Sequence, residues 1–123
     1  MPDLNFFILY VESPLASAGF YTELFGHAPV DSAPTFVLFA LANGNKLGLW
    51  ARAGVEPAAT APAGSGELCF PQADRAALDA LHESWQGRGW SIIQAPTEMD
   101  FGRTFTALDP DGNRLRAFVP NPP

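Results

Sequence analysis

The sequence contains few basic residues and a single cysteine. Seven Lys and Arg against 13 Asp and Glu give a formal net charge of -6 at pH 7. A nucleic-acid-binding protein needs a basic face for its phosphate contacts, so this balance argues against that function. The lone cysteine, Cys69, excludes an internal disulfide.

Long apolar runs are also missing. The longest run, residues 6–11, is far too short to cross a bilayer, and the N-terminus lacks the basic start of a secretory signal. Phosphate-binding glycine loops and the motifs of Ser-His-Asp hydrolases are not found either. We therefore expect a cytoplasmic protein of bacterial type that contacts neither membranes nor nucleic acids.

What the sequence does contain is an ordered series of predicted elements. The first half predicts four strands, which cover residues 5–11, the neighbourhood of Val30, 35–41 and 46–51. Ser13 and Pro14 give the N-cap and first turn of a helix that Gly26 ends. Asn43-Gly44 predicts a hairpin turn between the last two strands.

The same order returns in the second half. Its four predicted strands cover residues 67–70, 91–94, 104–108 and 115–119. Asp74 caps a helix that ends near Gly87. Residues 53–65, rich in Ala, Pro and Gly, predict a linker. We expect an α+β fold in a single domain, residues 1–123, with βαβββ modules at about 4–52 and 66–120.

Two segments resemble a known superfamily. LYVESPLASAGFYTELFG, from Leu9, is similar to the first strand and helix of the vicinal-oxygen-chelate (glyoxalase, bleomycin resistance protein and extradiol dioxygenase) superfamily. DPDGNRLRAFVP, from Asp109, resembles its last hairpin. The resemblance implies two βαβββ modules that curl around a cup. It says little about function, because the superfamily includes lyases, dioxygenases and proteins that only bind drugs.

The resemblance also implies where a metal would be held in the enzymes of the superfamily. It places the ligands at four positions, which here are Phe6, Trp50 (or a neighbour), Glu67 and Arg116. Phe and Trp offer no lone pair to a metal, and Arg has no acceptor and stays protonated. His27 and His82 lie away from these positions, in or after the helices. We predict a protein without a metal or another cofactor.

Strand alternation predicts which side chains face the cup. It places Phe6, Ile8 and Tyr10 on one face of the first strand, and Phe7, Leu9 and Val11 on the other, which packs under the helix in this fold. The same parity directs a further set into the cup: Gly48, Trp50, Glu67, Cys69, Arg114, Arg116 and Phe118. An aromatic cup with one or two charges suits flat, partly polar ligands. The alternative is that these aromatic residues simply fill a core.

Two other features each have more than one interpretation. Glu67 and Arg116 form an ion pair where the metal would lie, or Glu67 binds a cationic group or acts as a general base. Residues 97–103, which include Met99 and Phe101, form a lid over the cup or an ordinary exposed loop.

The leading hypothesis is a protein that binds and sequesters small molecules without catalysis. Such a protein would resemble the bleomycin-resistance branch of the superfamily, whose homodimers bind aromatic or cationic antibiotics. The predicted ligand contacts are Phe6, Tyr10, Trp50, Glu67, Met99, Phe101 and Arg116. Two alternatives stay open. One is a glyoxalase-like lyase or dioxygenase-type enzyme, with an unorthodox metal site or with Glu67 as base, and the other is a regulatory module that binds a protein partner.

Overall fold

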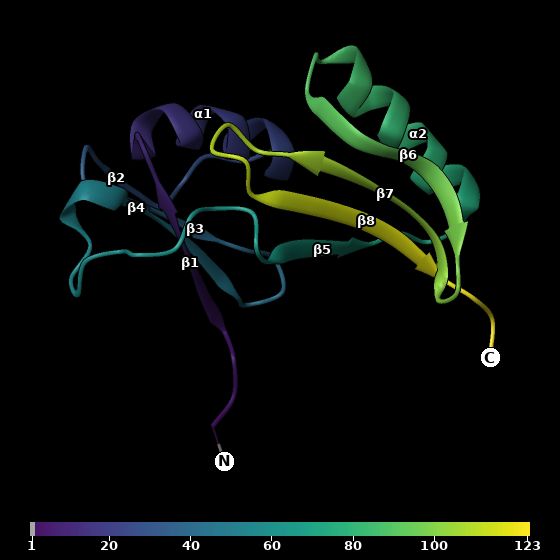
Figure 1. Ribbon diagram of the computed structural model, residues 1–123, viewed down its shortest axis with the longest axis horizontal. Coiled ribbons are helices and arrows are strands. Elements are labelled where there is room, and N and C mark those ends of the chain that lie inside the picture. Colours follow the sequence, from purple (N-terminus) through teal and green to yellow (C-terminus); the bar gives the residue numbers. More distant parts are fainter. Residues whose placement is uncertain (1) are drawn as a thin grey trace. The chain divides into compact units, whose positions relative to one another are not determined.

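The computed structural model describes residues 2–123 and shows an α+β fold with the same order of elements in each half (Figure 1). The chain divides into two compact units, residues 1–61 and 62–123, which we call module 1 and module 2. The boundary lies inside the segment predicted as a linker. Val55 in this segment is buried, so part of the predicted linker is packed into the fold. The predicted fold class, with two βαβββ modules, is confirmed.

Module 1 is a four-stranded mixed sheet with one helix. Its elements are β1 (Phe6–Val11), α1 (Pro14–Phe25), β2 (Asp31–Ala33), β3 (Phe36–Ala40), β4 (Lys46–Ala51) and the short 3-10 helix η1 (Arg52–Gly54). The strand order is β1-β4-β3-β2. β1 runs parallel to β4, and the other pairs are antiparallel.

Module 2 repeats this topology. Its elements are β5 (Glu67–Pro71), α2 (Arg75–Gly87), β6 (Ser91–Met99), β7 (Gly102–Leu108) and β8 (Arg114–Pro120). The strand order is β5-β8-β7-β6, with β5 parallel to β8 and the remaining pairs antiparallel. In both sheets the first strand of the module therefore pairs with its last strand and lies at an edge.

Both helices begin at the predicted residues. The Ser13 hydroxyl accepts a hydrogen bond from Ala16 N at 3.3 Å, and Pro14 follows in the first turn. The Asp74 carboxylate accepts one from Ala77 N at 2.8 Å. These caps satisfy N–H groups that have no partner inside the helix, which is why such residues start helices.

In each module the helix covers one face of its own sheet, and the core of the module lies between that helix and that sheet (Figure 1). In module 1 the core comprises Val11, Ala18, Tyr21, Val37, Phe39, Leu47 and Leu49. In module 2 it comprises Leu78, Trp85, Phe105, Ala107, Leu115 and Ala117. The alternate residues of the strands point to the other side of each sheet. We call that side the open face, and the candidate functional residues lie there.

The burial of β1 follows the predicted alternation only in part, since Leu9 is half-buried and Phe7 is exposed. Val11 is fully buried on the helix side, as expected, but Phe7 on the same side is 37% exposed. The reason is the position of α1, which packs chiefly over β3 and β4 and leaves the edge strand β1 poorly covered.

The expectation of a loop or lid at residues 97–103 is wrong. β6 continues to Met99 and β7 starts at Gly102, so the segment is the end of a β-hairpin with Asp100 and Phe101 at its turn. The tip is fixed to the C-terminal segment, since Asn121 N donates to the Phe101 carbonyl at 2.8 Å. Gly102 adopts a φ of 146°, where a side chain would overlap the Val119 carbonyl.

An ion-pair network fastens this hairpin to α2. Arg103 on β7 pairs with Asp79 on α2 at 2.9 Å and with Glu98 on β6 at 3.2 Å. Arg75 on α2 also pairs with Glu98. These ion pairs connect the end of the hairpin to the helix that covers its sheet.

Candidate functional site

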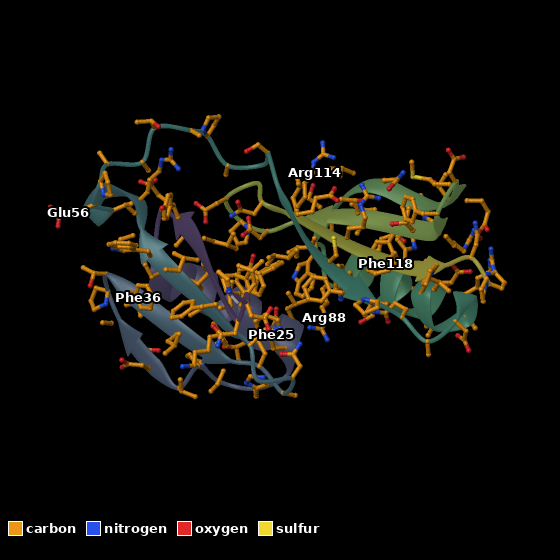
Figure 2. The ribbon with its side chains drawn as sticks, turned by 90° about the horizontal axis from the view of Figure 1, so that it is seen from below. Phe25, Phe36, Glu56, Arg88, Arg114 and Phe118 are labelled. Carbon is orange, nitrogen blue, oxygen red and sulfur yellow. The ribbon has the colours of Figure 1, made fainter. Side chains whose placement is uncertain are left out.

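The open face of module 1 is aromatic. The register pairs Tyr10 on β1 with Trp50 on β4, and Trp50 with Phe36 on β3, so these three side chains share one face. Phe6 lies on the same face, four residues before Tyr10. We call Phe6, Tyr10, Phe36 and Trp50 the aromatic face; Phe36 is labelled in Figure 2.

The rings of the aromatic face gather around Gly48. A Cβ atom built on Gly48 would lie 2.6 Å from Phe36 Cζ and 3.1 Å from Phe6 Cε1. Tyr10 and Trp50 meet edge to face, with their ring centroids 6.2 Å apart, and Phe36 and Trp50 do so at 6.3 Å. Because Gly48 has no side chain, the rings of Phe36 and Phe6 can pack directly against the sheet at this position.

These aromatic side chains remain in contact with solvent. Phe6 is 42% exposed and Tyr10 is 40% exposed, and Ile8 between them is 43% exposed. Trp50 and Phe36 are half-buried. The rings are therefore only partly covered by the rest of the protein, which favours the binding interpretation of Phe6 and Trp50 over the core interpretation.

The open face of module 2 is polar and is organised by Arg116. Its Nε donates to Glu67 Oε1 at 2.8 Å and its Nη2 donates to Glu67 Oε2 at 2.9 Å, which makes a bidentate ion pair. Its Nη1 donates to Gln94 Oε1 at 3.0 Å and to Thr104 Oγ1 at 3.1 Å. Thr106 donates in turn to Gln94 Oε1 at 3.1 Å. The arginine is thus held by strands β5, β6 and β7.

The ion pair fixes the charge state of both partners. The hydrogen bonds from Arg116 hold the pKa of the Glu67 carboxyl below its usual value, against the opposing effect of burial. The same bonds raise the pKa of Arg116. A carboxylate with a lowered pKa and both oxygens engaged is a poor general base, so this arrangement does not favour catalysis by Glu67.

Cys69 lies beside this pair, opposite Arg116 in the β5–β8 register, and its thiol is exposed. Partial burial raises the pKa of the thiol, and the Glu67 carboxylate acts in the same direction. Cys69 is therefore held as a neutral thiol rather than as a reactive thiolate.

The residues at the superfamily's metal positions do not fit a metal. Phe6 and Trp50 present rings without lone pairs. Glu67 has carboxylate oxygens, but both accept hydrogen bonds from Arg116, whose positive charge would repel a cation. A divalent ion needs about three protein ligands at an open site, and this set supplies one carboxylate that is already engaged.

The predicted ligand contacts therefore fall on three parts of the molecule. Phe6, Tyr10 and Trp50 come together on the open face of module 1, and Glu67 and Arg116 on that of module 2. Met99 and Phe101 are exposed at the end of the β6–β7 hairpin. The Met99 sulfur accepts a hydrogen bond from Gln94 Nε2 at 3.5 Å, which connects it to the Arg116 cluster. The Phe101 carbonyl accepts a hydrogen bond from Asn121 N of the C-terminal segment.

The sequence analysis missed several residues of these faces. Phe36 is the most important one. The strands fold back over a three-residue turn, residues 42–44, which pairs Phe36 with Trp50, whereas a two-residue turn at Asn43-Gly44 would have placed Phe36 opposite Ala51. Gln94, Thr104 and Thr106 had no comparable signal. They are ordinary polar residues whose role depends on the guanidinium of Arg116.

The chain belongs to the Glyoxalase/Bleomycin resistance protein/Dioxygenase superfamily, which matches residues 3–117. The resemblance found in the sequence is thereby confirmed.

Among the residues that the structure describes, no helix is long and apolar enough to span a membrane.

Individual relatives add to this assignment. The phenazine antibiotic resistance protein EhpR of Enterobacter agglomerans is 30% identical over 115 residues, which cover 91% of this chain and 88% of that protein. A protein from Agrobacterium tumefaciens, known from a solution NMR structure, is 48% identical with a TM-score of 0.91, over 99% of this chain and 100% of the other. A glyoxalase-related enzyme from Fulvimarina pelagi shares the fold, with a TM-score of 0.83 at 23% identity over 97% of this chain and 88% of the other.

Proposed function

We propose that this protein binds a flat aromatic molecule on the aromatic face of module 1 and holds it without changing it chemically. The observation that supports the proposal is the exposure of Phe6 and Tyr10 beside Trp50. Complete burial of a large apolar side chain contributes about 1.5–3 kcal/mol, and these partly exposed rings forgo a part of that free energy. A cluster of such residues on one sheet face is typical of a binding surface.

The geometry of the rings suits a planar ligand. Tyr10 and Phe36 both meet Trp50 edge to face, at interplanar angles of 81° and 69°, so neither ring is stacked on the face of Trp50. Aromatic contacts of this kind contribute about 0.5–1.5 kcal/mol each beyond the apolar area that they bury. Several rings acting together are enough for useful affinity without any reactive group.

The ligand class is suggested by the relative from Enterobacter agglomerans, whose name connects it with resistance to phenazine antibiotics. Phenazine is a planar tricyclic aromatic, which is the shape that the aromatic face suits. Sequestration would protect a cell through affinity alone. The state of Glu67, held as a carboxylate by Arg116, favours this mode over an enzymatic one.

The proposal includes the site of action and the assembly. We place the protein in the bacterial cytoplasm, where the exposed free thiol of Cys69 would stay reduced. Its superfamily includes homodimeric drug-binding proteins, and we expect a homodimer here. Size-exclusion chromatography with light scattering should then give twice the chain mass of 13.2 kDa, and a monomer at every concentration would contradict the assembly.

The substitution Trp50→Ala tests the proposed site. Trp50 contacts both Tyr10 and Phe36, so its loss removes the centre of the aromatic face. Phenazine affinity should fall at least about tenfold, which corresponds to roughly 1.4 kcal/mol. Isothermal titration calorimetry is the suitable measurement, because phenazines absorb light in the range of tryptophan fluorescence.

Two control variants make the result specific. Trp50→Phe keeps a ring and should retain most of the affinity. Trp90→Ala removes a tryptophan of module 2 that lies against Trp85 and should leave binding unchanged in the folded protein. Phenazine recovered after incubation should be unaltered by mass spectrometry. Equal affinity in Trp50→Ala and the unmodified protein, or a modified ligand, would refute the proposal.

A further inference from the structure

The open face of module 2 carries more positive than negative charge, in contrast to the acidic chain as a whole. Arg114 and Arg116 lie two residues apart on β8, and Glu67 faces them from β5. Glu67 lies within ion-pair distance of both, at 2.8 Å from Arg116 and 3.8 Å from Arg114. One carboxylate therefore stands against two guanidinium groups, while the whole chain has a charge of -6.

The single carboxylate is committed to Arg116. Both of its oxygens accept hydrogen bonds from Arg116 Nε and Nη2, at 2.8 and 2.9 Å. Arg114 Nη1 is 3.8 Å from Glu67 Oε2, which is beyond the range of a hydrogen bond. Arg114 is thus the surplus cation of the cluster.

Arg75, Arg103 and Arg116 each form an ion pair at hydrogen-bond distance, which Arg114 does not. Arg75 and Arg103 form ion pairs with Glu98, and Arg103 also pairs with Asp79. Arg52 donates to the Ala61 carbonyl, and Arg88 lies 5.2 Å from the centre of the Trp90 ring. The Arg114 side chain is 45% exposed, and it is labelled in Figure 2.

We infer that Arg114 anchors the carboxylate of a small aryl carboxylate on the open face of module 2. A guanidinium presents its donors in a planar fork that matches a carboxylate. One surplus positive charge suits a monoanion. A phosphate dianion would face the same single charge and stronger repulsion from Glu67.

Residues near Arg114 offer contacts to the aromatic ring of such a ligand. Four of the five N–H donors of Arg116 bind Glu67, Gln94 and Thr104, so the plane of the guanidinium is held in place. Flat guanidinium groups stack on aromatic rings. Phe118, further along β8 in Figure 2, belongs to the same open face by its parity. The site is complete within module 2 and does not depend on the function proposed for module 1.

Benzoate and its neutral counterpart benzamide test the inference. In ¹⁵N-resolved NMR titrations of the full chain, benzoate should shift the Arg114 Nε–H signal saturably, and benzamide should not. Acetate and inorganic phosphate should bind more weakly than benzoate. Arg114→Gln should lower benzoate affinity about fivefold. Higher salt should weaken benzoate binding, because the anchor is exposed to screening.

Arg88→Gln serves as the matched control. It removes the same charge at the end of α2, away from the open face, and should leave benzoate affinity within about twofold. The inference is overturned if benzamide binds as well as benzoate, if phosphate binds more tightly, or if Arg114→Gln retains full benzoate affinity. Neutral phenazine tests the aromatic face alone. Its failure to bind would refute the function proposed for module 1 and would leave the inference on Arg114 unaffected.

Discussion

Gly48 shapes the aromatic face through the space that its missing side chain leaves. Its backbone conformation is not one that requires glycine, since its φ is outside the left-handed region. The requirement is space: Phe36 Cζ and Phe6 Cε1 lie 2.6 and 3.1 Å from where a Cβ would be. Both contacts involve the ends of side chains, which can turn away.

Gly48→Ala should therefore change binding more than stability. The displaced rings can move into solvent, so the free energy of unfolding should fall by no more than about 1 kcal/mol, at the lower end of overpacking costs. Phenazine affinity should fall about fivefold in calorimetric titrations, because Phe36 and Phe6 leave their places around residue 48.

Gly19→Ala provides the comparison for that substitution. A Cβ on Gly19 in α1 would have no neighbour within 4 Å, and alanine favours a helix, so this variant should bind normally and be slightly more stable. Unchanged phenazine binding by Gly48→Ala would show that the ring arrangement around Gly48 is irrelevant to the ligand.

Among the elements, those with strong local signals were predictable from the sequence. Ser13-Pro14 and Asp74 start helices through hydrogen bonds that depend only on neighbouring residues. Asn43-Gly44 marks the short hairpin between β3 and β4. Alternation along β1 places Tyr10 on the same face as Phe6. These predictions succeeded because the responsible interactions are close in sequence.

The end of β6 was not predictable in the same way. Two register irregularities, between Ile92 and Gln94 and between Gln94 and Thr97, break the alternation that marks a strand. Pro96 further disguises the strand, although β6 is an edge strand and can accept a proline. The pairing with β7 and the bonds from Arg103 to Asp79 hold the hairpin, and neither is visible locally.

The candidate site shows the same division. Alternation was enough to place Phe6 and Trp50 on one face, and the family resemblance was enough to bring Glu67 and Arg116 together. The network that holds Arg116 required the three-dimensional positions of Gln94 and Thr104, which lie on different strands. The surplus charge on Arg114 became visible only when the distances from Glu67 to both arginines were compared.

For the whole molecule, the central distinction is between a ligand-binding protein and a metalloenzyme, and thermal stability separates them. A ligand that binds only the folded protein raises its stability by mass action. At a free phenazine concentration ten times Kd this contributes about 1.4 kcal/mol, which should raise the melting temperature by roughly 5 °C for a chain of this size. Trp50→Ala should show little of that increase at the same phenazine concentration.

Added nickel, cobalt, zinc or manganese should produce no comparable increase. The superfamily's metal positions hold two aromatic rings, an arginine and a carboxylate that the arginine already binds. The measurement is a thermal melt of untagged protein, first without additives and then with each metal or phenazine. A saturable rise at about one equivalent of any metal would contradict the metal-free interpretation of Phe6, Trp50 and Arg116. A rise with phenazine alone, lost in Trp50→Ala, would agree with binding at the aromatic face as the source of the stabilisation.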